Sequence, residues 1–204
     1  MKKTTKIILK TATKYAVKSA KKAAVKYAEN QALEAAGIRK NRQPRQVSDT
    51  VVLRDMRRAD MGAVLEMMRD FYASEAVFTN GSDDIFRRDI SECISDSPYA
   101  EGFVFAEVKG EEEHLLGYAM IAHSFSTEFG RRCIWIEDLY LKEEARGLGL
   151  ASQFLDYLSA EYPDALHRLE AEHENGHAME IYKRKGFGEL PYVEMVRNAE
   201  GQEK

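Results

Sequence analysis

Charge divides this 204-residue chain into two unequal parts, and the division limits which part can fold around a core. Residues 1–48 carry 13 basic and 2 acidic side chains, a net charge of +11, whereas residues 49–204 carry 17 basic and 32 acidic ones, a net charge of −15. A stretch of roughly 150 residues can bury about 70% of its unfolded surface. Residues 1–48 are rich in Lys and Ala and poor in large apolar side chains, so we expect the globular domain to span residues 49–204.

The basic part, residues 1–48, is predicted to be a helical extension followed by a linker. Ala, Lys and Glu dominate residues 6–38, and no Pro or Gly intervenes before Gly37, which favours a helix. Residues 39–50 are polar and basic, as is typical of a linker. Such a helix attracts polyanions, so an interaction protein that binds nucleic acid, an anionic membrane or an acidic partner is an alternative function. A solvated tail, or one that docks on the acidic domain, is the simpler interpretation.

From residue 51 the pattern is that of a mixed α/β (α+β) domain. Short runs rich in β-branched and aromatic residues predict strands, and amphipathic segments predict the helices between them. Asp60 and Ser82 stand where helix N-caps are expected. We expect strands over 51–53, 103–109, 115–123, 132–141, 166–171 and 192–197, and helices after Asp60, from 82 or 83 to 97, over 148–160 and over 176–185.

A glycine loop, Arg146-Gly147-Leu148-Gly149-Leu150-Ala151, lies between a predicted strand and an amphipathic helix. Small residues let backbone amides approach an anion, and a helix N-terminus adds unpaired donors and a positive dipole. The arginine adds a permanent charge, so the loop predicts a phosphate or pyrophosphate site. It lacks the lysine of a P-loop, and Ser152 stands where a dinucleotide-binding fingerprint needs Gly or Ala.

The pattern Arg146-x-x-Gly149-x-Ala151 resembles the acetyl-CoA pyrophosphate loop of the GNAT superfamily of N-acetyltransferases. Asn175-x-x-Ala178-x-x-x-Tyr182-x-x-x-Gly186-Phe187 is similar to the second signature of that family, and the resemblance covers roughly residues 51–197. It implies a mostly antiparallel sheet flanked by helices, acetyl-CoA as co-substrate without a metal, and often a homodimer. The Glu137–Tyr140 run is weakly similar to the polyamine-acetylating branch. The resemblance implies cofactor contacts from Leu139, Tyr140, Leu141, Arg146, Gly147, Leu148, Gly149, Leu150, Ala151 and Asn175.

Acetyl transfer to an amine requires a base and an acid, and two residues are candidates for these roles. An amine with a pKa near ~10 is protonated at neutral pH, so a base must deprotonate it before attack. Glu137, on the predicted strand 132–141, is the candidate base, while a regular strand would turn Asp138 to the opposite face. Glu137 could also be a plain polar strand residue. The resemblance assigns Tyr182 as the acid that protonates the departing thiolate.

A competing signature, His173-Glu174-Asn175-Gly176-His177, satisfies the H-E-x-x-H pattern of zinc peptidases. That pattern binds zinc only when all five residues are helical. Gly176 is a poor helix-interior residue and Asn175 prefers a cap, so a zinc metallopeptidase is a minor alternative.

Composition favours a cytoplasmic protein. The two cysteines cannot form a disulfide framework, and no stretch approaches the ~18 uncharged apolar residues of a membrane span. The positively charged start is not followed by the apolar region of a signal peptide.

Overall fold

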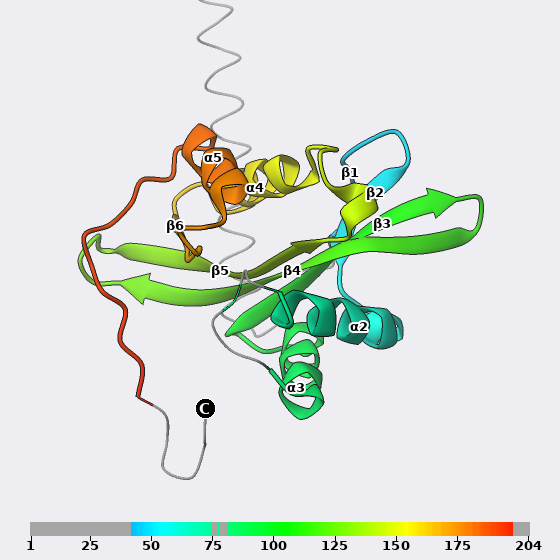
Figure 1. Cartoon of the computed structure of the whole chain (residues 1–204), viewed down its shortest axis with the longest axis horizontal. Helices are drawn as coiled ribbons and strands as arrows, with labels where there is room; N and C mark the ends of the chain where they lie inside the picture. Colours follow the sequence, from blue (N-terminus) through cyan, green and yellow to red (C-terminus); the bar gives the residue numbers. More distant parts are fainter. Residues whose placement is uncertain (1–41, 75–76, 78–80, 198–204) are drawn as a thin grey trace, which may run out of the picture. The chain divides into compact units, whose positions relative to one another are not determined.

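A six-stranded sheet forms the frame of the molecule (Figure 1). The computed structural model describes residues 42–74, 77 and 81–197. Strand order along the sheet follows the chain, and neighbours are antiparallel except for the last pair, which is parallel. The strands are β1 Arg45–Gln46, β2 Val51–Asp55, β3 Ala100–Lys109, β4 Glu112–Ser126, β5 Arg131–Leu141 and β6 Leu166–Leu169. The expected mixed, mostly antiparallel sheet is confirmed.

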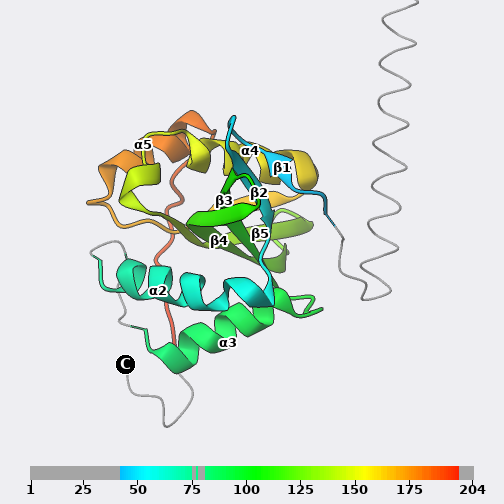
Figure 2. The ribbon, with the colours of Figure 1, turned by 90° about the vertical axis from the view of Figure 1, so that its right-hand side faces the viewer.

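Helices cover both faces of the sheet (Figure 2). One pair packs on the first face and the other pair on the second. Two short 3₁₀ turns, η1 Arg58–Asp60 and η2 Glu143–Ala145, precede the first helix of each pair. The helices are α2 Met61–Tyr72 and α3 Asp83–Ile94 on one face, and α4 Leu150–Glu161 and α5 Gly176–Arg184 on the other. Each matches a helix expected from the sequence to within a few residues at its ends.

The period-two alternation of β3 shows how one sheet serves two cores. Phe103 and Phe105 pack into the cluster under α4, which also holds Phe154. Val104, between them, packs into the cluster under α2 and α3, which also holds Ile90. Because β3 is covered on both sides, its central residues are all buried apolar ones.

Asp60 stands at the expected position before α2 but does not cap the helix with its side chain. Its carboxylate accepts hydrogen bonds from Arg54 at 2.8 and 2.9 Å and from the Arg57 backbone N–H at 2.7 Å. A buried guanidinium needs a carboxylate partner, and that requirement outweighs the helix cap here.

Two expectations from the sequence are corrected. No strand forms over 192–197; Val193, Met195 and Val196 are 87%, 90% and 79% exposed, so this apolar run has no surface to pack on. The expected linker over 39–50 is also wrong in its second half. There the chain forms β1, which lies within the compact unit that begins at Arg42.

The helix expected over 6–38 lies outside the described residues, so the basic extension stays a prediction. Across residues 42–74, 77 and 81–197, no helix has the length and apolarity that a membrane span requires.

Candidate active site

The parallel pair β5 and β6 separates halfway along β5. The two strands are paired from Cys133 opposite Leu166 to Ile136 opposite Leu169, where β6 ends. Strand β5 continues to Leu141, paired on its other side with β4. Beyond Ile136, one edge of β5 is therefore open, and its backbone groups on that edge have no strand partner.

A β-bulge lies at the point of separation. Met120 of β4 pairs with Asp138 and Ile121 pairs with Ile136, so Glu137 is an extra residue without a partner on β4. Bulges of this kind bend a strand and redirect its side chains. The regular strand assumed from the sequence is thus wrong here, and Asp138 does not turn to the α4 side with Ile136.

Asp138 instead faces α2, where it is 4% exposed. Its two carboxylate oxygens accept hydrogen bonds from the hydroxyls of Tyr72 at 3.2 Å and Tyr118 at 3.0 Å. Desolvation raises the pKa of Asp138 to about 6, although the two tyrosines favour the ionised form. Both acceptor positions face tyrosines, so Asp138 is a buried structural acid beside the site.

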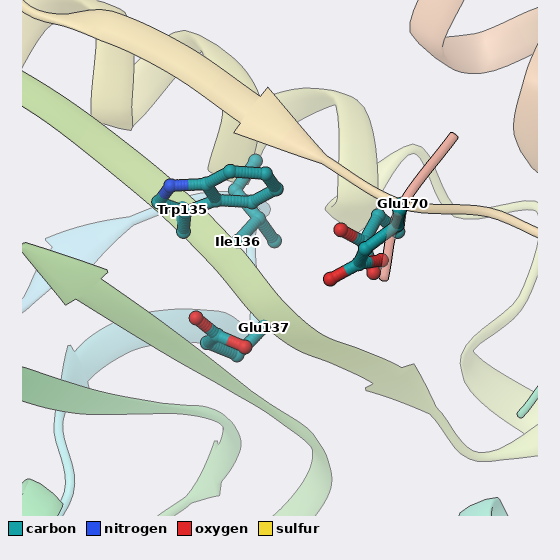
Figure 3. A pocket seen from close by; sticks show the side chains of 5 residues that line it. Trp135, Ile136, Glu137 and Glu170 are labelled. Carbon is teal, nitrogen blue, oxygen red and sulfur yellow. The ribbon is translucent and has the colours of Figure 1, made fainter. Parts of the chain in front are cut away.

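A pocket of about 190 Å³ occupies the mouth of the separation, lined by Trp135, Ile136, Glu137, Glu170 and Glu194. Figure 3 shows Glu137 on β5 and Glu170 beyond the end of β6, on either side of this space. Desolvation, helped by Glu194 and Asp89, raises the pKa of Glu137. Desolvation and a hydrogen bond with Glu194 raise the pKa of Glu170 to about 7. The volume is below the roughly 300–1,000 Å³ of sites for drug-sized ligands, and three of the five lining residues are glutamates, so the pocket is small and acidic.

The glycine loop connects η2 to α4 at the far end of β5. Gly147 and Gly149 have φ values of 78° and 76°, which side chains with a Cβ rarely adopt. Gly149 is the N-cap residue of α4, and no side chain caps the helix there. The first backbone amides of α4, from Leu150, therefore have no acceptor within the helix and are available to an anion. Arg146 Nε donates to the Leu141 carbonyl at 3.1 Å, which holds this exposed guanidinium next to the loop.

The open edge of β5 also presents backbone donors. The Lys142 amide donates to the Leu116 carbonyl on β4 at 2.9 Å. Amides alternate in direction along a strand, so those of Leu139 and Leu141 point away from β4, toward the open edge, whereas that of Tyr140 points toward β4. Of the three residues expected to contact the cofactor here, two therefore present an N–H on the correct side.

Helix α5 carries the two remaining candidate residues. Asn175 is its N-cap, and its side-chain oxygen accepts a hydrogen bond from the Ala178 amide at 3.3 Å. Tyr182 is half-buried and meets Phe187 edge-to-face, with ring centroids 5.9 Å apart. Desolvation raises the pKa of the Tyr182 hydroxyl, which keeps it protonated at neutral pH. Tyr182 does not line the pocket that contains Glu137.

The H-E-x-x-H residues do not form a helical pair. His173 lies in a turn before α5, whereas His177 is the second residue of the helix. Because Asn175 caps α5 between them, the two imidazoles do not have the one-turn helical spacing that the zinc motif requires.

Comparison with known proteins agrees with this geometry. Residues 64–187 match the model of the acetyltransferase (GNAT) family. The thialysine N-epsilon-acetyltransferase of Bos taurus is 29% identical over 154 residues, which cover 71% of this chain and 88% of that protein. A possible acetyltransferase from Clostridium difficile 630 superposes with a TM-score of 0.61 at 17% identity, over 74% of this chain and 99% of that one. The enzyme AAC(6')-Iy, in complex with a bisubstrate analogue of CoA and acetylneamine, gives a TM-score of 0.58 at 14% identity, over 73% and 98%.

The family match spans more than half of the chain and contains both signatures that carried the resemblance. This chain belongs to the GNAT family of acetyl-CoA-dependent acetyltransferases.

Proposed function

We propose that this chain transfers the acetyl group of acetyl-CoA to a primary amine that is positively charged in solution. One observation carries the proposal: β5 and β6 separate beside a bulged glutamate, and the open edge leads from there to an uncapped helix N-terminus. An acidic pocket and an anion site then lie at the two ends of one exposed strand edge.

At the glycine-loop end of the open β5 edge, backbone amides and Arg146 can hold the cofactor. The amides at the start of α4 and the guanidinium of Arg146 would hold the pyrophosphate, and the exposed glycines 147 and 149 leave the backbone accessible. The amides of Leu139 and Leu141 would align the pantetheine arm and receive the charge that develops on the acetyl oxygen. Bound acetyl-CoA would supply an activated thioester, and the remaining chemistry would fall to the backbone amides and side chains of this chain.

The acidic end fits the acceptor. Glu137, Glu170 and Glu194 bring three carboxyl groups around a space of about 190 Å³, into which a cationic amine fits. A typical amine with a pKa near ~10 must lose a proton before it attacks, and the raised pKa of Glu137 makes this carboxylate a better base than an ordinary one. The relatives act on amines too: one is named for the ε-amine of thialysine, and another was bound to an acetylneamine analogue. A side-chain ε-amine is therefore the acceptor class that we propose.

The departing thiolate needs a proton because the parent thiol has a pKa near ~8.5. Tyr182 is the donor that we propose, since desolvation keeps its hydroxyl protonated. No covalent enzyme intermediate is required, because the C–N bond forms as the C–S bond breaks. Glu137 takes the first proton from the ammonium before attack. The second nitrogen proton, lost as the amide forms, restores the Tyr182 hydroxyl that has protonated the thiolate.

Thiol release from acetyl-CoA, screened over polyamines, lysine analogues, aminoglycosides and peptide amines, tests the proposal. We expect turnover with at least one cationic amine, and a loss of about 10²-fold or more in kcat for Glu137→Gln. Glu112→Gln, on the exposed start of β4, is the matched control and should leave kcat unchanged. Equal rates for both variants would remove Glu137 from the role of base.

A further inference from the structure

The guanidinium of Arg168, on β6, lies against a residue that lines the acidic pocket. Its carbon Cζ is 5.5 Å from the ring centroid of Trp135, which lines the pocket, and 5.9 Å from the ring centroid of Phe129. Trp135 belongs to β5, and Phe129 belongs to the turn between β4 and β5. A cation is attracted to the face of an aromatic ring, so the two rings hold this guanidinium at a fixed place on the sheet.

The N–H donors of Arg168 are not satisfied by an anion of the described part of the chain. Arg168 Nε is buried there without a hydrogen-bond partner. Glu128 Oε2 lies 3.9 Å from Arg168 Nη2, beyond hydrogen-bond distance, and the other oxygen of Glu128 accepts from the Tyr192 hydroxyl at 2.9 Å. A guanidinium presents its donors as a fixed fork that matches a carboxylate. Because the side chain of Arg168 is 22% exposed, part of this fork is open to a ligand from solvent.

Arg168 and Glu137 lie close enough for one small molecule to contact both. Arg168 is directly opposite Trp135 in the parallel pairing of β5 and β6. Glu137 follows Trp135 by two residues, which is about 7 Å along a strand. Glu170 follows Arg168 by the same two residues, and Figure 3 shows Trp135, Glu137 and Glu170 around one space. The strand pair therefore carries a cation at the level of Trp135 and carboxyl groups farther along, where the strands separate.

A ligand with an ammonium group at one end and a carboxylate at the other matches this order of charges. The single bonds between Nζ and the carboxyl carbon of lysine, of roughly 1.5 Å each, span about 7 Å when extended. An ε-amine at Glu137 then brings the carboxylate of the same molecule to Arg168. A carboxylate placed at the other end of the pocket meets Glu170 and Glu194 instead, and like charges disfavour that orientation.

We propose that Arg168 binds a carboxylate of the acceptor, and that the acceptor is therefore a free amino acid with a side-chain amine. The inference rests on the proposed function and narrows its acceptor class from ε-amines in general to those that carry a carboxylate. Trp135 and Phe129 hold the guanidinium in place before the ligand arrives, which reduces the entropy lost on binding. Arg168 supplies specificity, while Glu137 and Tyr182 keep the chemical roles proposed above.

Lysine, lysine amide and cadaverine test the inference on the unaltered full chain. These amines have the same spacing between their two amino groups and carry a carboxylate, a neutral amide or a hydrogen atom at one carbon. In the thiol-release assay, kcat/KM for lysine should be at least about tenfold above the values for the other two, through a lower KM. Fluorescence of the single tryptophan, Trp135, measured with CoA in place of acetyl-CoA, should rank the three dissociation constants in the same order.

Substitutions then assign the preference to Arg168. Arg168→Gln should raise KM for lysine at least about tenfold more than KM for cadaverine. Arg168→Lys keeps the charge without the fork and should retain only part of the preference. Arg131→Gln, which removes an exposed arginine at the start of β5, is the matched control and should keep the full preference. A preference for lysine that survives unchanged in Arg168→Gln contradicts the assignment.

The outcomes separate this inference from the proposed function. Lysine amide or cadaverine handled as well as lysine, in turnover and in binding, overturns the inference and leaves the proposed function standing. If no amine of the wider screen is acetylated, the proposed function is overturned. Tighter binding of lysine than of its amide, lost in Arg168→Gln, still supports the carboxylate site in that case. Absence of both turnover and preferential binding overturns the two together.

Discussion

The Asp138→Asn substitution tests the buried acid beside the site. Every element packed against Asp138 contributes a group that faces it: Tyr72 from α2, Tyr118 from β4, Asp89 from α3 and the neighbouring Glu137. The tyrosines donate hydrogen bonds, and the two other carboxylates oppose ionisation. Asparagine has the same shape and an oxygen that accepts from the same hydroxyls, while its NH₂ can donate back to a phenolic oxygen. The variant should therefore keep the packing and lose only the titration.

The size of the effect on the unfolding free energy follows from the pKa shift of Asp138. In the unfolded chain the group titrates near 3.8, and in the folded chain near 6, a difference of about 2 units. At 1.36 kcal/mol per unit, the folded state loses about 3 kcal/mol as the pH rises through this window. The sign is set by proton binding: between these values the folded state holds the proton and the unfolded state does not, so stability falls with rising pH. Above about pH 7, one unit beyond the folded-state pKa, the whole loss is present.

Urea denaturation of both proteins at a series of pH values measures this difference. Far-UV circular dichroism is the suitable signal, because the single tryptophan, Trp135, lines the pocket beside the titrating Glu170. Relative to wild type, the unfolding free energy of Asp138→Asn should rise by about 3 kcal/mol between about pH 4 and pH 8. The other carboxylates titrate in both proteins and cancel in the comparison. Two stability curves that stay parallel across this range would refute the assigned burial cost.

Three further substitutions test the cofactor end and the acid. Tyr182→Phe should lower kcat about 10²-fold or more with no change in acetyl-CoA affinity, and a turnover that is unaltered at every pH would exclude the acid role. Arg146→Ala removes a charged donor beside the loop, so calorimetry should show acetyl-CoA binding about tenfold or more weaker; an unchanged dissociation constant would contradict the pyrophosphate assignment. Gly149→Ala forces a Cβ into a backbone at φ 76° and should lower the unfolding free energy by about 1–2 kcal/mol. Its control, Gly62→Ala on the exposed face of α2, should be neutral or stabilising, and an equal loss in both would show that the φ value is not the cause.

Local features of the sequence predicted most of the elements. Ser82 and Asn175 cap α3 and α5 as expected, because a cap needs only a short side chain and the next three amides. The glycine loop was identified for the same reason, since the positive φ values of Gly147 and Gly149 are a local requirement.

Expectations that depended on distant partners failed. The run 192–197 has strand-forming residues, yet a strand also needs a neighbouring edge and an apolar surface to cover. Residues 45–46 look like linker in composition, but they pair with β2, and Arg42 finds three partners on other elements. Single-sequence patterns contain no information about these pairings.

The sequence alone predicted the helices of the folded unit, five of its strands, the anion loop and the candidate pair Glu137 and Tyr182, from local spacing and the family signatures. Only the tertiary structure decided what surrounds Glu137. The bulge arises from the register between β4 and β5, and it buries Asp138 against α2. The pocket arises where β6 ends at Leu169 while β5 continues, so Glu170 lies beside Glu137, and Glu194 joins them from the irregular run after α5. Electrostatic coupling between carboxylates depends on their distance in space. In this protein the distance between Glu137 and Glu170 depends on where β5 and β6 separate.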